Sequence, residues 1–569
     1  MYEEIYERWL KCATGDLDII KELKDISGNY AEIEDRFYKN LEFGTAGLRG
    51  VIGAGTNRMN IFTVGAATQG LAEYINSITE KGSVAIAYDS RIKSDVFARY
   101  AAEVFAANGI KVYIYPELMP TPMLSFAVRY LKCDAGIVIT ASHNPSKYNG
   151  YKAYGPDGCQ LNPEASEFVY NIIEKVDIFD GVKHCDFEKA EKEGKINIIG
   201  KEVVEAYLDA VQEQSVADDS YDFGKLNVIY TPLNGAGNKP VRAILKRIGV
   251  KNVHVVKEQE MPDGNFPTAP FPNPEIKQAF ECALKLAETV DPDLLLATDP
   301  DSDRVGIAVK HNGEFTLMTG NEVGTLLLNY LLKRKTELHT LPKNPVAVKT
   351  IVSTELADRV AGSYNCELRE VLTGFKFIGE QIHLLEEKHE ENRFIMGFEE
   401  SYGYLAGGYV RDKDAVVGSM LICEMCCYYK GKNMTLIDAL NELYEKYGYY
   451  YNCQKSIVCE GKDGMEKMAS SMDRLRNCPV KKIGESDVSI YKDYQKSLKV
   501  DKDGNKEEIK LPKSNVLSYS LSDGSSVIIR PSGTEPKIKI YISTKDSSLN
   551  AAKEKSVSLE KSVVELLAL

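Results

Sequence analysis

One short stretch, residues 135–152 with the sequence AGIVITASHNPSKYNGYK, limits most strongly how this chain can fold. Its first six residues, 135–140, are apolar or β-branched, which predicts a short buried strand. Ser142 and His143 follow, in a loop closed by the turn-favouring pair Asn144-Pro145. Reacting groups in α/β proteins lie in such loops at the carboxyl ends of strands. The same residues also occur in ordinary turns, and this stretch alone leaves both interpretations open.

Helical and strand-like segments alternate around this stretch. Phe62–Thr79 and Ser94–Asn108 have helical patterns, and Ser83–Tyr88 and Lys111–Tyr115 have strand patterns. The alternation predicts an α/β layer with a mostly parallel sheet. Residues 1–26 are expected to form an amphipathic helix.

The length of the chain requires several domains. A chain of 569 residues is too long for one hydrophobic core and suggests roughly three or four domains. A polar segment at residues 212–223 gives the first boundary, and new α/β units follow it. We place the domains at residues 1–215, 216–325, 326–448 and 449–569.

Charge and composition exclude some classes of function. The net charge of −13 argues against a general nucleic-acid or membrane-surface binder, because both need a basic face. The cysteines, three of which lie in an apolar run at residues 423–427, fit reduced thiols of a cytosolic protein. The N-terminal residues have neither a basic start nor an apolar core of a signal peptide, and we expect a cytoplasmic protein.

The segment TDPDSDR at residues 298–304 follows a second apolar strand. Asp299, Asp301 and Asp303 alternate, so in an extended backbone they point to one side. Three crowded carboxylates repel one another unless a hard divalent cation lies between them. An EF-hand is excluded, since Arg304 and Lys310 stand where it needs Gly and Glu. We predict a Mg²⁺ site shared with a phosphate; a solvated acidic turn is the alternative.

Two further loops contain candidate binding groups. In RPSGTEP, residues 530–536, the guanidinium of Arg530 can bind a phosphate, and nearby hydroxyls and backbone N–H groups can add donors. In GFEESYGY, residues 397–404, Glu399 and Ser401 lie on one face if extended and can bind sugar hydroxyls. A structural turn and a surface strand end are the alternatives.

Taken together and in order, these motifs resemble the α-D-phosphohexomutase superfamily, which includes phosphoglucomutases and phosphomannomutases. The four similar segments are TASHNP at Thr140–Pro145, DPDSDR at Asp299–Arg304, GFEES at Gly397–Ser401 and RPSGTEP at Arg530–Pro536. DPDSDR and GFKFIG are most similar to the branch with phosphopentomutase-like enzymes and some bacterial phosphoglucomutases. The resemblance implies four domains around a central cleft. Three would be related α/β domains with mixed sheets, and the C-terminal one a TATA-box-binding-protein-like α+β domain.

The resemblance also implies a role for each matching residue. Ser142 would carry the phosphoryl group and would complete the Mg²⁺ site with Asp299, Asp301 and Asp303. The other residues around the reacting phosphate would be Arg49, His143, Lys152 and Arg304, with His143 or Lys152 as proton carriers. The sugar and the second phosphate would be bound by Lys376, Glu399, Ser401, Lys413, Arg530, Ser532, Gly533 and Thr534.

The implied reaction is the interconversion of glucose 1-phosphate and glucose 6-phosphate through a phosphoserine and glucose 1,6-bisphosphate. Alternatives are mannose, pentose or amino-sugar phosphates as substrates, a serine-based sugar phosphatase, and a non-catalytic sugar-phosphate sensor. We expect a phosphorylated sugar as the partner, no nucleic acid and no membrane, and a monomer or homodimer.

Overall fold

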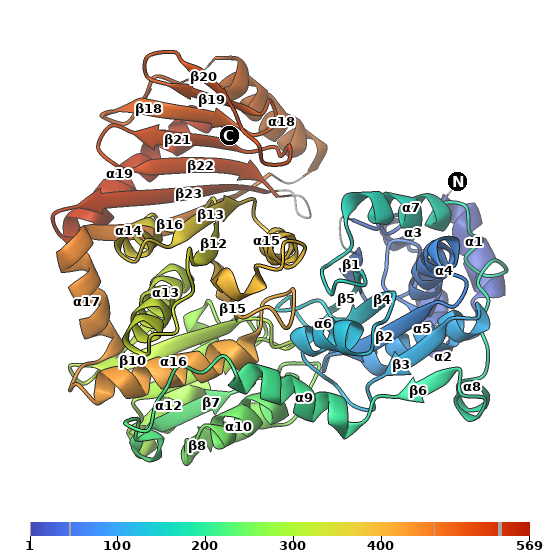
Figure 1. Cartoon of the computed structure of the whole chain (residues 1–569). Helices are drawn as coiled ribbons and strands as arrows, with labels where there is room; N and C mark the ends of the chain where they lie inside the picture. Colours follow the sequence, from blue (N-terminus) through green and yellow to red (C-terminus); the bar gives the residue numbers. More distant parts are fainter. Residues whose placement is uncertain (1, 45–46, 460, 479, 533–536, 569) are drawn as a thin grey trace.

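A computed structural model describes residues 2–44, 47–459, 461–478, 480–532 and 537–568. Four sheets follow one another along the chain (Figure 1). The first three are mixed and the last is antiparallel, which confirms three α/β domains and a different C-terminal one. No helix among the described residues has the length and apolar character needed to cross a bilayer.

The first sheet has six strands in the order β1-β5-β4-β2-β3-β6. Neighbours among β4, β2, β3 and β6 are parallel, whereas β5 and β1 are antiparallel additions at one edge. The predicted strand at residues 135–140 is β4, and all its residues are buried. The strand bounds are β1 Gly47–Val51, β2 Ser83–Tyr88, β3 Lys111–Ile114, β4 Ala135–Ile139, β5 Tyr148–Tyr154 and β6 Ile196–Ile198.

Helices cover this first sheet, and the N-terminal part differs from expectation. The single helix expected over residues 1–26 is wrong, because the chain forms two helices there. Asp16 caps the second one, its side chain accepting the backbone N–H groups of Asp18 and Ile19, so a new helix begins at this point. The helices are α1 Tyr2–Cys12, α2 Leu17–Asp25, α3 Tyr30–Phe37, α4 Ile61–Ile78, α5 Ser94–Ala107, α6 Thr121–Tyr130, α7 Pro163–Ile173, α8 Phe187–Lys192 and α9 Lys201–Gln212.

The second and third sheets repeat the plan of parallel strands with an antiparallel edge. The second has the order β11-β10-β9-β7-β8 and the third β13-β12-β14-β15. Their bounds are β7 Asn227–Thr231, β8 Asn252–Val255, β9 Leu294–Thr298, β10 Val305–His311, β11 Glu314–Met318, β12 Val346–Thr350, β13 Glu367–Val371, β14 Phe394–Glu399 and β15 Gly403–Ala406. The main helices are α10 Asn238–Arg247, α12 Glu281–Val290, α13 Gly320–Glu337, α14 Leu356–Ser363, α15 Phe375–Glu386, α16 Ala415–Lys430 and α17 Leu436–Tyr447.

One of the expected domain boundaries divides a helix. The boundary between residues 325 and 326 falls inside α13, which packs against α14 and β14 of the third domain. We therefore propose that the third domain begins before Gly320. The other bounds stay predictions.

The fourth sheet runs β16-β23-β22-β21-β18-β19-β20, with β17 beside β18. Helices α18 Gly461–Asn477 and α19 Leu549–Leu567 lie against it, and their buried residues share a core with the strands. Ile528 and Tyr541 pack with Ile351 and Leu372 of the third domain. The bounds are β16 Tyr449–Val458, β17 Lys482–Ile483, β18 Ser486–Asp493, β19 Leu498–Asp501, β20 Lys506–Glu508, β21 Leu517–Leu521, β22 Ser526–Pro531 and β23 Lys537–Asp546.

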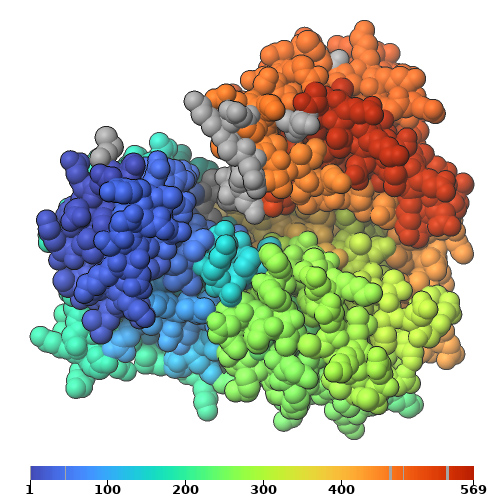
Figure 2. All heavy atoms as spheres, turned by 180° about the vertical axis from the view of Figure 1, so that it is seen from behind, coloured from blue at the N-terminus to red at the C-terminus, as the bar shows by residue number. Residues whose placement is uncertain are grey.

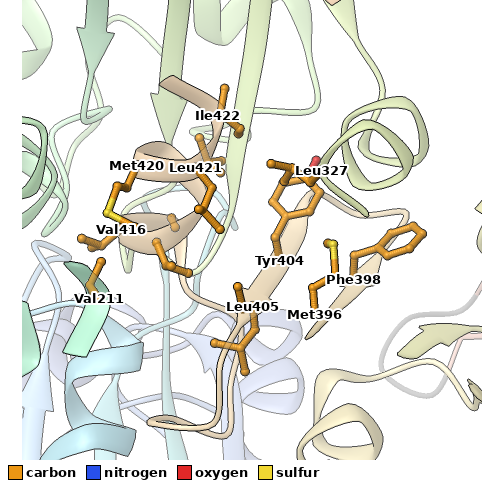
Figure 3. Packing of buried hydrophobic residues seen from close by; sticks show 14 of the residues in the cluster. Val211, Leu327, Met396, Phe398, Tyr404, Leu405, Val416, Met420, Leu421 and Ile422 are labelled. Carbon is orange, nitrogen blue, oxygen red and sulfur yellow. The ribbon is translucent and has the colours of Figure 1, made fainter. Parts of the chain in front are cut away.

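A single hydrophobic core fixes the first three domains relative to one another. Met420 and Leu421 of α16 pack among Val211 of α9, Leu327 of α13 and Met396 of β14 (Figure 3). The fourth domain lies on the third and apart from most of the first, as both views show (Figures 1 and 2). Loops from the first three domains are therefore held at fixed positions relative to one another and can form one site.

Candidate active site

Ser142 lies directly beyond the carboxyl end of β4, buried, with φ +53°. Its backbone N–H donates to Oγ1 of Thr140 at 2.8 Å, which stabilises the left-handed turn. Its hydroxyl donates to Oδ2 of Asp299 at 2.8 Å and lies 3.2 Å from Nδ1 of His143. The loop of the first domain thus meets the loop of the second at this hydroxyl.

A buried arginine supports this loop from beneath. The guanidinium of Arg91 donates to four carbonyls of the loop, those of Ser142, Asn144, Pro145 and Tyr148. Asp89 lies 3.4 Å from Arg91 Nε and accepts the Thr140 hydroxyl at 2.6 Å. Neither Asp89 nor Arg91 was predicted from the sequence. The available signal was the segment DSR directly after the strand at residues 83–88, which neighbours β4 in the sheet.

The three aspartates converge as predicted. Asp299, Asp301 and Asp303 are buried, and one carboxylate oxygen of each lies within 4.8 Å of the others. Oδ1 of Asp299 accepts the backbone N–H groups of Asp303 and Arg304 at 3.1 and 3.0 Å, which folds the loop back on itself.

The arrangement fits a divalent metal ion. Within the described part of the chain, Oδ1 of Asp301 and Oδ1 of Asp303 are buried without a hydrogen-bond partner. An unpaired buried carboxylate oxygen is costly, and a hard cation with oxygen ligands would remove that cost. The residues present therefore suit such an ion. The Ser142 hydroxyl, hydrogen-bonded to Asp299, lies at the edge of this group of carboxylates.

Two lysines from different domains approach the aspartates. Nζ of Lys152, on β5, lies 2.8 Å from Asp301 and 3.4 Å from Asp303. Nζ of Lys413, from the loop before α16, lies 2.9 Å from Asp303. Thr121 adds a hydroxyl donor to Asp301 at 2.9 Å. The two ammonium groups balance part of the acidic charge.

Burial and charge set the protonation states here. Burial raises the pKa of Asp299 well above its usual range, and the neighbouring carboxylates Asp301 and Asp303 raise it further. Burial acts in the same direction on the pKa of Asp301, but Lys152 outweighs it and that pKa is lowered. Burial works against the charged form of Lys152, but the aspartates raise its pKa and keep it an ammonium. Burial, with Arg304 and Arg49, lowers the pKa of His143 well below its usual value, so the imidazole is neutral at pH 7.

The remaining predicted cations lie beside the same loops. Nη1 of Arg49, on β1, donates to Oδ1 of Asn144 at 3.1 Å. Nη1 of Arg304 donates to Glu275 at 2.6 Å, a residue that the sequence analysis did not select.

A second group of residues lies on the third and fourth domains. Glu399, buried at the end of β14, accepts the N–H of Gly374 at 2.9 Å. Thr373, which precedes Gly374 in the sequence, accepts a hydrogen bond from Nη1 of Arg530, on β22. These contacts link the predicted sugar loop to the predicted phosphate loop. Helix α15 follows Gly374, and Lys376 lies in its first turn.

The other predicted substrate residues are only partly described. Ser401 lies in the turn between β14 and β15 and lines a pocket of about 340 Å³ between the third and fourth domains. The N–H of Ser532 donates to the carbonyl of Lys537 at 2.8 Å. Gly533 and Thr534 lie outside the described residues. Lys539, which pairs with Arg530 across β22 and β23, is a further cation that sequence analysis missed.

Models of four families match the chain in order. They are phosphoglucomutase/phosphomannomutase alpha/beta/alpha domain I at residues 40–178, domain II at 205–313 and domain III at 319–447, and the phosphoglucomutase/phosphomannomutase C-terminal domain at 475–557. The motifs TASHNP, DPDSDR, GFEES and RPSGTEP lie in these four regions, one in each.

Individual proteins match along most of their length. A phosphoglucomutase of Staphylococcus saprophyticus is 39% identical over 505 residues, covering 88% of this chain and 90% of that protein. One of Staphylococcus aureus is 39% identical over 544 residues, 95% of each. The fold resembles that of a putative phosphomannomutase of Thermus thermophilus, with a TM-score of 0.69, 21% identity and coverage of 93% and 100%. The chain therefore belongs to the phosphoglucomutase/phosphomannomutase family of the α-D-phosphohexomutase superfamily.

Proposed function

We propose that the protein catalyses the reversible interconversion of α-D-glucose 1-phosphate and glucose 6-phosphate, with Ser142 as the phosphoryl carrier. The observation that carries the proposal is the contact between the Ser142 hydroxyl and Asp299 inside the buried aspartate group. Bacterial phosphoglucomutases at 39% identity support glucose as the sugar.

In this scheme phospho-Ser142 transfers its phosphoryl group to the 6-hydroxyl of glucose 1-phosphate. The 6-hydroxyl loses its proton as its oxygen bonds to phosphorus, and the Ser142 oxygen takes up a proton as its own bond to phosphorus breaks. The products are glucose 1,6-bisphosphate and a free serine hydroxyl. The bisphosphate then turns in the site and returns its 1-phosphoryl group to Ser142. Glucose 6-phosphate is released, and the serine is ready for another cycle.

Mg²⁺ would be held by Asp299, Asp301 and Asp303 and by an oxygen carried on Ser142. When bound, it would neutralise charge on the transferring phosphoryl group. Arg49, Lys152 and Arg304 would add fixed positive charge in a site that excludes water. His143, neutral and beside the Ser142 hydroxyl, would contact the phosphate and is the candidate to accept the proton.

A second phosphate requires a second site. We assign it to Arg530, Ser532, Gly533, Thr534 and Lys376, and the sugar to Glu399, Ser401 and Lys413. The link from Glu399 through Gly374 and Thr373 to Arg530 supports this division, because it sets the distance between sugar loop and phosphate loop. A general phosphatase has little use for such a clamp.

Substrate comparison tests the proposal. We expect kcat/KM to be highest for glucose 1-phosphate, lower for mannose 1-phosphate and ribose 1-phosphate, and to rise with added glucose 1,6-bisphosphate. A higher kcat/KM for mannose 1-phosphate or ribose 1-phosphate would show that the same mechanism acts on a different sugar phosphate. Steady release of inorganic phosphate without any bisphosphate requirement would show a phosphatase instead.

We further propose that the enzyme acts in the cytoplasm, on a free sugar phosphate, as a monomer or homodimer.

A further inference from the structure

The helices α1, α2 and α3 lie outside the four matched regions, the first of which begins at residue 40. They are nevertheless part of the core of the first domain. Trp9 of α1 contacts the rings of Phe37, Phe62 and Phe179, with centroid distances of 5.4 to 5.7 Å. This aromatic cluster fixes α1 and α3, and buried Ile19 and Leu23 add α2 to the same core, so the three helices form a fixed cover on this domain.

Two charged side chains of this cover hold the loop at residues 52–60, which connects β1 to α4. Oε2 of Glu22, on α2, accepts the N–H of Ala54 at 2.7 Å. Nη1 of Arg36, on α3, donates to the carbonyl of Ala54 at 3.3 Å, and the carbonyl of Arg36 accepts the N–H of Asn57 at 3.0 Å. Both helices thus bind the backbone of the loop.

The fit between cover and loop is close enough to require glycine. Gly53 and Gly55 have φ values of +151° and +128°. A Cβ on Gly55 would lie 2.6 Å from the backbone oxygen of Arg36, and one on Gly53 would lie 2.8 Å from Oε1 of Glu22. A side chain at Gly55 would require the loop and α3 to move apart, whereas one at Gly53 would displace the carboxylate of Glu22 and strain the backbone.

The same loop touches the phosphoserine loop on its other side. The N–H of Ile52 donates to the carbonyl of Lys147 at 2.8 Å. β1 is the outer strand of its sheet, where Arg49 pairs with Gly150 of β5 and donates to Asn144. The chain that leaves this strand is therefore held between the N-terminal helices and the loop that carries Ser142.

We propose that Glu22 and Arg36 are positioning residues for Arg49. By holding the loop after an edge strand, they keep the Arg49 guanidinium at the phosphoserine loop. This inference rests on the proposed role of Arg49 at the reacting phosphate. Displacing such a group by about 1 Å costs on the order of 100-fold in rate, so a contact remote from the chemistry can control it.

The first test substitutes Glu22 and compares it with a matched glutamate. Glu22→Ala removes the acceptor of Ala54 N–H, whereas Glu32→Ala removes only a pairing with Arg36 within α3. We expect kcat/KM for glucose 1-phosphate to fall by about 10-fold or more in Glu22→Ala and to stay near wild type in Glu32→Ala. Equal effects of the two substitutions would overturn the proposal.

The second test uses the two glycine positions. Gly55→Ala places a Cβ against the backbone of α3 and pushes the loop away from that helix. Gly28→Ala is the control, because Gly28 also has a positive φ but no atom lies within 4 Å of the new Cβ. We expect Gly55→Ala to lose activity as Glu22→Ala does and Gly28→Ala to keep it. If Gly55→Ala does not fold, the comparison of Glu22→Ala with Glu32→Ala alone tests the proposal.

A double-mutant cycle separates positioning from general destabilisation. Glu22→Ala should add little to the loss caused by Arg49→Ala, because the group that it positions is already absent. In combination with Arg530→Ala, the fold-losses in kcat/KM of the two single variants should multiply. If the fold-losses also multiply with Arg49→Ala, the inference is overturned and the proposed function stays intact. Wild-type activity in Arg49→Ala would instead contradict the role of Arg49 itself.

Discussion

The hydroxyl of Ser142 donates to Oδ2 of Asp299 at 2.8 Å across 157 residues of chain. The two residues follow β4 and β9, strands of different sheets, and meet because the domains share one core. The Ser142 hydroxyl and the group of aspartates are consequently held together before substrate arrives, which lowers the cost of organising the site.

Removal of the metal should abolish activity reversibly. We expect a chelator to stop turnover and Mg²⁺ to restore it, since phosphoryl transfer needs charge neutralisation. Asp303→Asn should raise the Mg²⁺ concentration for half-maximal activity by on the order of 10- to 100-fold. Asp209→Asn, at an exposed partner of Arg247, is the control. Unchanged activity after exhaustive chelation would refute the metal assignment.

Arg530 should act on binding of the second phosphate. We expect Arg530→Ala to raise the KM for glucose 1-phosphate by on the order of 10-fold or more, because it removes a charge-assisted phosphate contact. Phosphorylation of Ser142 by glucose 1,6-bisphosphate should still occur at high concentration. Steady-state kinetics measures the first effect and intact mass the second. A normal KM in this variant would argue against the clamp.

Arg91 should support both stability and catalysis. Arg91→Met leaves Asp89 buried beside an apolar side chain and removes the four contacts to loop carbonyls, and loss of a buried partner costs about 3–5 kcal/mol. We expect a clear fall in the unfolding temperature of the first domain and in kcat. Arg247→Met, which breaks surface pairs with Glu205 and Asp209, should cost about 0–1 kcal/mol. Calorimetry would decide, and similar shifts would contradict the support role.

The motifs that follow apolar strands were predictable because strand, turn and charge all lie close together in sequence. The three aspartates could be selected as a metal site in this way, whereas Ser142 stayed one of two interpretations until the family resemblance gave it a role. Periodicity predicted β2, β3 and β4 of the first sheet but not β1, β5 or β6. The supporting residues could not be identified so. Arg91 acts through backbone carbonyls of a loop more than 50 residues away, and Glu22 through a backbone N–H, and neither contact leaves a local pattern.

Helix ends and domain boundaries were also difficult to predict from the sequence. The break between α1 and α2 spans residues 13–16, where Thr14 and Gly15 form a turn and Asp16 caps the second helix, but apolar periodicity continues across it. The predicted boundary between residues 325 and 326 falls inside α13, because a buried helix with polar positions has the same pattern whether it packs on the sheet before it or on the one after it.

A link between the first and third domains should weaken in acid. Burial acts to raise the pKa of Glu386, but Arg129 of α6 and Arg411 outweigh it and lower it to about 2. Because the folded pKa is lowered, the stabilisation is present above the ordinary value near 4.5 and is lost as pH falls towards 2. We expect the difference in unfolding temperature between wild type and Glu386→Gln to shrink from pH 6 to pH 3. A constant difference would contradict this origin.

In the proposed mechanism Ser142 carries the phosphoryl group, and labelling can show this directly. Wild-type protein incubated with phosphate-labelled glucose 1,6-bisphosphate should gain one labelled phosphate, located at Ser142 by peptide mass, and should pass it to glucose 1-phosphate or glucose 6-phosphate. Ser142→Ala should bind Mg²⁺ but acquire no label and lose mutase activity by several orders of magnitude. Mg²⁺-dependent mutase turnover by Ser142→Ala near the wild-type rate would show that Ser142 is not the phosphoryl carrier.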